Sequence, residues 1–204
     1  MAPNYPRFGP LGARNACATG NACYVGGYNP PVLRPYRSIH PRVAPTAFID
    51  QSAQVIGDVH IGAESSIWMN VVIRGDVNSI RIGARTNVQD CTVVHVMRET
   101  HPTVIGNDVT IGHAAVVHGC TIENRCLIGM GAVLLNGCHI GQGSIVAAGA
   151  LLPEGMTVPA GSMVMGMPAK VRRGLTPDED ASLRWYADNY VRYRLDFQHD
   201  SDSV

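Results

Sequence analysis

The stretch VIGNDVTIGHAAVVHGC, residues 104–120, places an apolar residue at every sixth position, at Ile105, Ile111 and Val117. A helix would place apolar residues three and four apart, and an amphipathic strand would place them two apart. A period of six fits a short strand followed by a turn, with one inward side chain in each unit. The stretch therefore predicts an all-β repeat that winds around a common core.

The six-residue period extends beyond this stretch in both directions. It begins at about residue 49 and continues to Val164, with three extra residues after Ile73 and a longer excess at Val96 to Thr103. After Val117 the phase slips by one residue. Glycine often follows the apolar residue, and we expect it where the backbone needs positive φ. The apolar markers are Ile49, Val55, Ile61, Ile67, Ile73, Ile82, Val88, Val94, Ile105, Ile111, Val117, Ile122, Ile128, Leu134, Ile140, Val146, Leu152, Val158 and Val164.

A repeat of this period and extent resembles the hexapeptide-repeat family. The resemblance implies a left-handed parallel β-helix of triangular section, with three six-residue units in each coil. We therefore predict an irregular, proline-rich N-terminal arm over 1–44, the β-helix over 45–172, and a C-terminal α-helix and tail over 173–204. Thr176 is a good N-cap and Pro177 suits the first helical position, which predicts the helix over about 177–195.

The composition limits the partners of the chain. Charged residues make up only 16% of its 204 residues, against about 25% in a typical soluble domain. Lys+Arg and Asp+Glu balance at 16 each, so we expect no nucleic acid and no anionic membrane surface as a partner. No run of about 18 apolar residues and no apolar signal segment occurs, and we expect a cytoplasmic protein. Four cysteines lie within the repeat, where we expect them to be buried: Cys91, Cys120, Cys126 and Cys138.

Three of the histidines within the repeat, His95, His113 and His118, are candidate metal ligands, since imidazole is the commonest metal-ligating side chain. If the two excess stretches are bulging loops that add no unit to a coil, Arg74, His95 and His118 each follow a marker of one column. Strands about 4.8 Å apart let two stacked imidazoles bind one ion. His113 falls on another edge of the triangle, so it would reach that ion only from the next chain of a trimer. The markers of the first column are Ile73, Val94 and Val117, and those of the other column are Val88 and Ile111.

Further polar residues fall on these two columns. Arg74 and Asp76 could pair and orient a ligating histidine, and the amide of Gln89 could orient a metal-bound water. Asp90 follows directly and could serve in the same way. Purely structural roles for Arg74, Asp76 and Asp90, such as ion pairs at an interface, remain an alternative that is compatible with catalysis.

Together these residues resemble the γ-class carbonic anhydrases over about residues 45–195. The resemblance implies a homotrimer in which His95 and His118 of one subunit and His113 of its neighbour hold Zn²⁺. Fe²⁺ or Co²⁺ would also suit three imidazoles. The matching motifs are Arg74-Gly75-Asp76, Gln89-Asp90, His95, Ile111-Gly112-His113, His118-Gly119-Cys120, Leu127-Ile128-Gly129-Met130-Gly131-Ala132 and Gly166-Met167-Pro168-Ala169-Lys170.

Two features depart from the best-studied archaeal member of that family. Val77 stands where that member has a glutamate, and a short stretch after His95 replaces its long acidic loop. Glu99 and His101 are therefore the candidates for proton transfer. Tyr190, on the expected helix, is similar to a tyrosine that reaches the metal site in bacterial homologues, and a packing role is the alternative.

The resemblance implies reversible hydration of CO₂ to bicarbonate. Zinc would lower the pKa of its water toward about 7, the hydroxide would attack CO₂, and Gln89 would orient that hydroxide. Two other functions remain open. One is a metal-binding scaffold or assembly subunit without turnover, which Val77 and the short loop favour. The other is an acyltransferase that uses acetyl-CoA, which needs only one histidine as general base.

Overall fold

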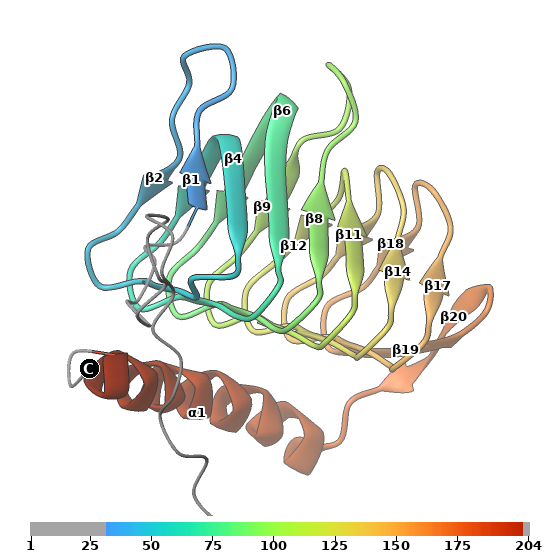
Figure 1. Cartoon of the computed structure of the whole chain (residues 1–204). Helices are drawn as coiled ribbons and strands as arrows, with labels where there is room; N and C mark the ends of the chain where they lie inside the picture. Colours follow the sequence, from blue (N-terminus) through green and yellow to red (C-terminus); the bar gives the residue numbers. More distant parts are fainter. Residues whose placement is uncertain (1–31, 202–204) are drawn as a thin grey trace, which may run out of the picture.

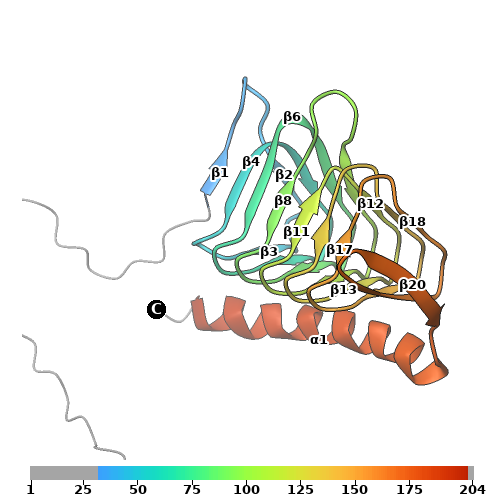
Figure 2. The same cartoon turned by 90° about the vertical axis from the view of Figure 1, so that its right-hand side faces the viewer.

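Parallel pairing of short strands builds a three-sided β-helix in the computed structural model, which describes residues 32–201. One long helix, α1 (Pro177–Ser201), runs along one side of it (Figure 1). Figure 2 shows the coils stacked from the β1 end to the β20 end, with α1 parallel to the stack. The predicted fold class, a hexapeptide-repeat β-helix of triangular section with a C-terminal helix, is confirmed.

Each side of the prism is one stack of parallel strands. Face 1 consists of β1 (Val32–Arg34), the first parts of β4 (Gln54–Ile61) and β6 (Val72–Ile82), β8 (Val93–His95), β11 (Val116–His118), β14 (Val133–Leu134) and β17 (Leu151–Leu152). Face 2 consists of β2 (Arg42–Val43), the second parts of β4 and β6, β9 (Thr103–Ile105), β12 (Thr121–Ile122), β15 (His139–Ile140) and β18 (Thr157–Val158). Face 3 consists of β3 (Phe48–Ile49), β5 (Ser66–Ile67), β7 (Asn87–Val88), β10 (Thr110–Ile111), β13 (Leu127–Ile128), β16 (Ile145–Val146), β19 (Ser162–Gly166) and the antiparallel β20 (Ala169–Gly174).

The predicted apolar markers form the core. Every marker from Ile49 to Val164 is at most 7% exposed, and they stack in three inward columns. Burying one such side chain contributes roughly 1.5–3 kcal/mol relative to leaving it in water. Cys120, Cys126 and Cys138 are also buried, as predicted. Cys91 is exposed, because it occupies a turn with φ of 60° between two columns. The prediction that Cys91 is buried is therefore wrong.

The glycines that follow the markers have a different purpose from the one predicted. Gly83 and Gly106 do not adopt positive φ; a Cβ added to Gly83 would lie 2.6 Å from the backbone of Gly106 in the next coil. Glycine stands at these corners because successive coils approach too closely for a side chain. Positive φ occurs instead three residues after a marker, for example at Gly131, with φ of 66°.

The two excess stretches differ from each other. The first was expected to bulge as a loop, but the backbone from Val72 to Ile82 is one continuous strand that serves two faces. The second is a loop, closed by a bridge between Met97 and His101, and it projects between β8 and β9 (Figure 1). Neither adds a unit to its coil, so the predicted columns are confirmed.

Part of the segment predicted as an irregular arm, residues 1–44, belongs to the β-helix. β1 and β2 both pair in parallel with β4 and extend the first coil. Between them a tight turn is closed by paired backbone bonds of Tyr36 and Ile39. The remainder of the predicted arm, residues 1–31, lies outside the described residues.

Helix α1 begins where the sequence predicts and continues to Ser201. The Thr176 hydroxyl accepts from the Glu179 amide at 3.3 Å, and the Glu179 carboxylate accepts from the Thr176 amide at 2.9 Å. This reciprocal pair satisfies two amide groups at the helix start. Leu183 and Ala187 are buried on the side that packs against face 3. Among the described residues, no helix combines the length and apolar character needed to cross a membrane.

Candidate metal centre

The register of face 1 brings two of the predicted ligands together. β8 and β11 pair so that His95 lies directly opposite His118, one coil apart. The two ring centroids are 5.0 Å apart, and His95 Nδ1 lies 3.0 Å from His118 Nε2. Each histidine ends its strand, at the edge of face 1 next to face 2. The imidazole pair therefore follows from the column register.

Hydrogen bonds on the outer sides of the rings decide which nitrogens carry protons. His95 Nε2 lies 2.9 Å from Asp76 Oδ1, and His118 Nδ1 lies 2.7 Å from Asn136 Oδ1. The Asn136 amide nitrogen donates to Glu154 Oε1 at 2.9 Å, so its oxygen is the atom that faces His118. Both contacts require the histidine to donate. When both rings are neutral, His95 Nδ1 and His118 Nε2 consequently face each other with two lone pairs.

Electrostatics favours the neutral form of His95. Burial lowers the pKa of His95, and the charges of Arg74 and His118 lower it further, against the opposing hydrogen bond to Asp76. Burial alone would raise the pKa of Asp76, but hydrogen bonds from His95 and Arg74 bring it below its usual value. Two lone pairs 3.0 Å apart repel each other unless an electrophile lies between them. Their donor set and their outer partners fit a metal ion such as zinc.

A buried hydroxyl that the sequence did not point to fixes both strand ends. Thr103 is fully buried; its Oγ1 donates to the His95 carbonyl at 2.6 Å and accepts from the Gly119 amide at 3.0 Å. Asn136 was also missed. Leu134 stacks on Val117, so the column places Leu135 beside His118, and counting coils does not point to Asn136.

His113 lies at the opposite edge of face 1, in the turn between β10 and β11. Its Nδ1 lies 2.9 Å from Asp90 Oδ2, and its side chain is 48% exposed. The ring thus donates to a carboxylate and keeps the Nε2 lone pair free, just as His95 keeps that of Nδ1 and His118 that of Nε2. Within the described residues of one chain, no three His, Cys, Asp or Glu side chains converge as a metal site. The chain alone brings two of the three predicted ligands together.

Gln89 and Tyr190 line a cavity of about 300 Å³ beside His113. Gln89 is 6% exposed, and its amide nitrogen donates to Asn87 Oδ1 at 3.1 Å. Tyr190 packs edge-on against Trp68, with ring centroids 5.5 Å apart. Burial, followed by the charge of Asp90, raises the pKa of Tyr190. Tyr190 therefore both packs and contributes to the cavity wall.

The two proton-transfer candidates lie in the loop between β8 and β9. Glu99 occupies its tip with φ of 61°. The His101 Nδ1 atom is 2.9 Å from the Thr100 hydroxyl. The ring lies against Gly137, where an added Cβ would be 3.2 Å from His101 Nε2. The loop thus places His101 over the corner that carries the imidazole pair.

Comparisons with known proteins agree with this architecture. The bacterial transferase hexapeptide family (six repeats) matches residues 102–135 and 119–153. YrdA of Escherichia coli is 46% identical over 172 residues, 81% of this chain and 94% of that protein. A probable carbonic anhydrase of Methanocaldococcus jannaschii is 56% identical over 144 residues, 71% of this chain and 90% of its own length. A solved hexapeptide transferase family protein from Anaplasma phagocytophilum has a TM-score of 0.79 at 43% identity, covering 81% of this chain and 98% of that one.

The fold and the histidine-bearing corner define a hexapeptide-repeat β-helix protein. Within that class, the chain belongs to the γ-carbonic anhydrase family, whose named members match it at 43–56% identity over most of its length. The relatives support a carbonic anhydrase-like enzyme.

Proposed function

We propose that the protein hydrates CO₂ reversibly to bicarbonate, with Zn²⁺ bound between the subunits of a homotrimer. One observation carries the proposal: His95 Nδ1 and His118 Nε2 face each other at 3.0 Å. The hydrogen bonds on the outer sides of the two rings leave a lone pair on each of these nitrogens. Each ring is fixed from behind by an acceptor, which is the arrangement that orients ligating histidines. A catalytic zinc site needs one more protein ligand and an open position.

The surface of face 1 supports a trimer that supplies this ligand. Helix α1 covers face 3, and the outer row of face 2 is mostly polar. Face 1 instead exposes an apolar row among the described residues, in which Val93 is 40% exposed. Such a row favours burial against another subunit. The row consists of Val72, Val93, Val116, Val133 and Leu151.

The histidines flank this apolar row. His113 precedes β11 and His118 ends it, so the two lie at opposite edges of face 1. A head-to-tail ring of three subunits brings unlike edges together at every interface. His95 and His118 of one subunit would then hold the ion together with the neighbour's copy of His113.

The other residues of the site have supporting roles. Zinc bound there would supply the Lewis acidity that brings the pKa of a water molecule toward about 7. Arg74 and Asp76 hold His95 in its ligating tautomer, and Asp90 does the same for His113. Gln89 and Tyr190 line the cavity beside His113 and are proposed to orient the reacting oxygen. Glu99 and His101 are proposed to pass the released proton to buffer. Fe²⁺ or Co²⁺ would suit the same three imidazoles.

The first test measures zinc content and CO₂ hydration by stopped flow. His113→Ala should remove zinc and activity together, although it leaves the imidazole pair of its own chain intact. His139→Ala is the matched control, because His139 also pairs with a carboxylate, Glu123, at 2.9 Å on an exposed surface. Full zinc occupancy in His113→Ala would refute the proposed ligand set.

Mixing two inactive variants tests whether the site is shared. His95→Ala and His113→Ala chains, unfolded and refolded together in equal amounts, should regain about one quarter of the wild-type sites if each site draws on two neighbouring subunits. If each chain held its own metal, mixing would restore nothing. No recovery would therefore refute the interface.

Two other functions are each supported by one observation. Val77 packs against the core and offers no carboxylate beside the site, which favours a metal-binding assembly subunit with weak turnover or none. A solved relative at 43% identity is named a hexapeptide transferase family protein, which favours an acyltransferase. Zinc without hydration would indicate the first, and acetyl-CoA turnover without metal would indicate the second.

A further inference from the structure

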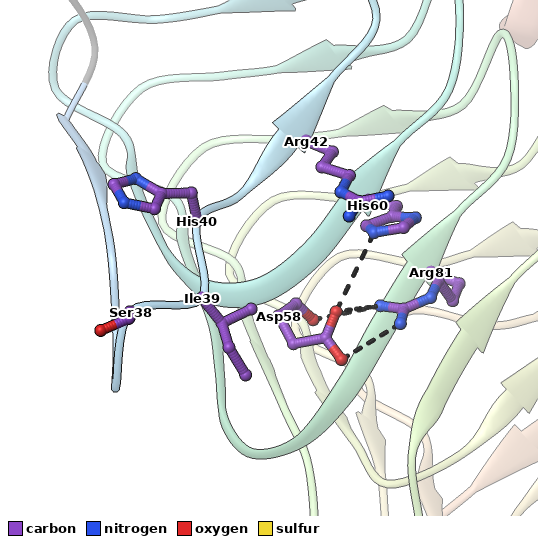
Figure 3. Close-up of a pocket in the computed structure, with 7 residues that line it drawn as sticks. All are labelled: Ser38, Ile39, His40, Arg42, Asp58, His60 and Arg81. Atoms are coloured by element: carbon purple, nitrogen blue, oxygen red, sulfur yellow. Dashed lines mark hydrogen bonds and ion pairs between the residues drawn. The ribbon is translucent and has the colours of Figure 1, made fainter.

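A cavity with no assigned purpose lies on face 2, at the end of the β-helix where β2 and β4 pair. Its volume is about 620 Å³, and Figure 3 shows the side chains that line it. The turn that ends at Ile39 forms one wall, and the outer surfaces of β2, β4 and β6 form the other. The lining residues are Ser38, Ile39, His40, Arg42, Asp58, His60 and Arg81. None of them belongs to the candidate metal centre.

The strand register stacks three basic side chains in this cavity. Arg42 pairs with His60, and His60 pairs with Arg81, on three successive strands of face 2. Neighbouring strands are about 4.8 Å apart. Two guanidinium groups thus flank one imidazole, and such N–H donors bind anions well. A basic row at three adjacent positions therefore favours a bound anion over a purely structural purpose.

One carboxylate is present, but it is already paired. Asp58 Oδ1 lies 2.8 Å from Arg81 Nη1, and Asp58 Oδ2 accepts from Arg81 Nη2 at 3.1 Å. The distance from Asp58 to His60 Nε2 is 4.0 Å. Arg42 has no ion pair with any carboxylate in the described part of the chain. Its guanidinium thus remains free to bind an oxyanion.

The charges around His60 also indicate an excess of positive charge in the cavity. Burial lowers the pKa of His60, and the charges of Arg81 and Arg42 lower it further, against a weaker opposing effect of Asp58. The cavity is therefore electropositive at the position of this ring. A dianion bound there would reverse the effect and let His60 take up a proton.

We propose that this cavity binds the phosphate group of a small organic molecule, with Arg42 and His60 as its main donors and Ile39 against the organic part. Guanidinium groups bind phosphate oxygens through two parallel N–H donors. Ile39 is 51% exposed and supplies an apolar surface beside the basic row. The site lies on another face from the metal centre, so the proposal stands independently of the proposed function.

The test uses the full-length protein, with inorganic phosphate and phenyl phosphate as probes, in isothermal titration calorimetry at constant ionic strength. Arg42→Gln should weaken phosphate binding by about tenfold or more, as expected for loss of a charged hydrogen-bond partner. Arg172→Gln, which changes an exposed arginine outside the cavity, should leave it unchanged. Phenyl phosphate should bind more tightly than phosphate to the wild type, and Ile39→Ala should remove that advantage.

Two further measurements make the assignment specific. Phosphate should raise the pKa of His60, followed by NMR, and should raise the Tm of the wild type but not of Arg42→Gln. The latter comparison also shows that the variant is folded. No saturable binding, equal binding by Arg42→Gln, or tighter binding of bicarbonate than of phosphate would each overturn the proposal.

Discussion

Replacing Asp76 by Asn tests the proposed tautomers of the histidine pair. Arg74 donates to Asp76 Oδ2, and His95 Nε2 donates to Asp76 Oδ1. An amide has only one oxygen, and that oxygen must face the guanidinium, which cannot accept. The NH₂ group of the new side chain then faces His95 Nε2. His95 must therefore move its proton to Nδ1, the atom that we propose binds the metal.

The size of the effect follows from this conflict. Loss of such an outer partner typically lowers metal affinity about 10- to 100-fold, which corresponds to about 1.4–2.7 kcal/mol. We expect the upper end, because the substitution selects the wrong tautomer as well as weakening a hydrogen bond. The assay is competition for Zn²⁺ against a chelator of known affinity, with trimer content followed by size-exclusion chromatography.

Asp108→Asn is the matched control for the assay. Asp108 accepts from Arg85 Nε at 2.7 Å, so this variant also loses an arginine–carboxylate pair, but away from the histidines. Its zinc affinity should equal that of the wild type. If Asp76→Asn also binds zinc as tightly as the wild type while remaining trimeric, the tautomer argument fails.

The remaining predictions concern stability and reactivity. Leu134→Ala removes a fully buried side chain of the face 1 column and should lower the free energy of unfolding by about 2–5 kcal/mol in urea titrations. Thr176→Ala removes the N-cap hydroxyl and should cost about 1 kcal/mol by the same measurement. A hydrogen bond from Arg173 lowers the pKa of Glu179 to about 2. The stabilisation by Glu179 is therefore present above its usual pKa and is lost as pH falls toward 2. The difference in free energy of unfolding between the wild type and Glu179→Gln should vanish in acid. Cys91 is exposed and should react with a thiol reagent in the native protein. Cys126, whose pKa burial raises to about 11, should react only after unfolding, as mass spectrometry of labelled peptides can establish.

Much of the fold could be predicted because each unit of the repeat places one side chain in the core. The period alone assigned the inward residues from Ile49 to Val164, and counting coils assigned the partners of His95 correctly. Features without a period were missed. β1 pairs with β4 through its backbone, and no spacing of side chains signals such pairing. One wall of the face 2 cavity is the turn that follows β1. The sequence did not predict this wall, because it too has no side-chain period.

The deviations from the period carry as much information as the period itself. Between residues 49 and 164, successive apolar markers are six residues apart at all but three steps. The exceptions are the steps from 73 to 82, from 94 to 105 and from 117 to 122. All three connect face 1 to face 2, in three successive coils. A regular corner suffices for stability, so irregularity confined to one corner indicates selection for another purpose.

That corner carries Asp76, His95 and His118, and the irregular steps explain how they meet. The first step lengthens a strand so that Asp76 reaches back to the His95 ring, and the second provides Thr103, which fixes the His95 carbonyl. The third shortens the turn after His118, where the Gly119 amide binds the same Thr103 hydroxyl. His113 follows a marker in a regular step of six residues, from 111 to 117. The irregular steps are confined to the corner where one chain by itself brings His95 and His118 together. A regular corner is sufficient for His113, the ligand that we propose each chain supplies to its neighbour.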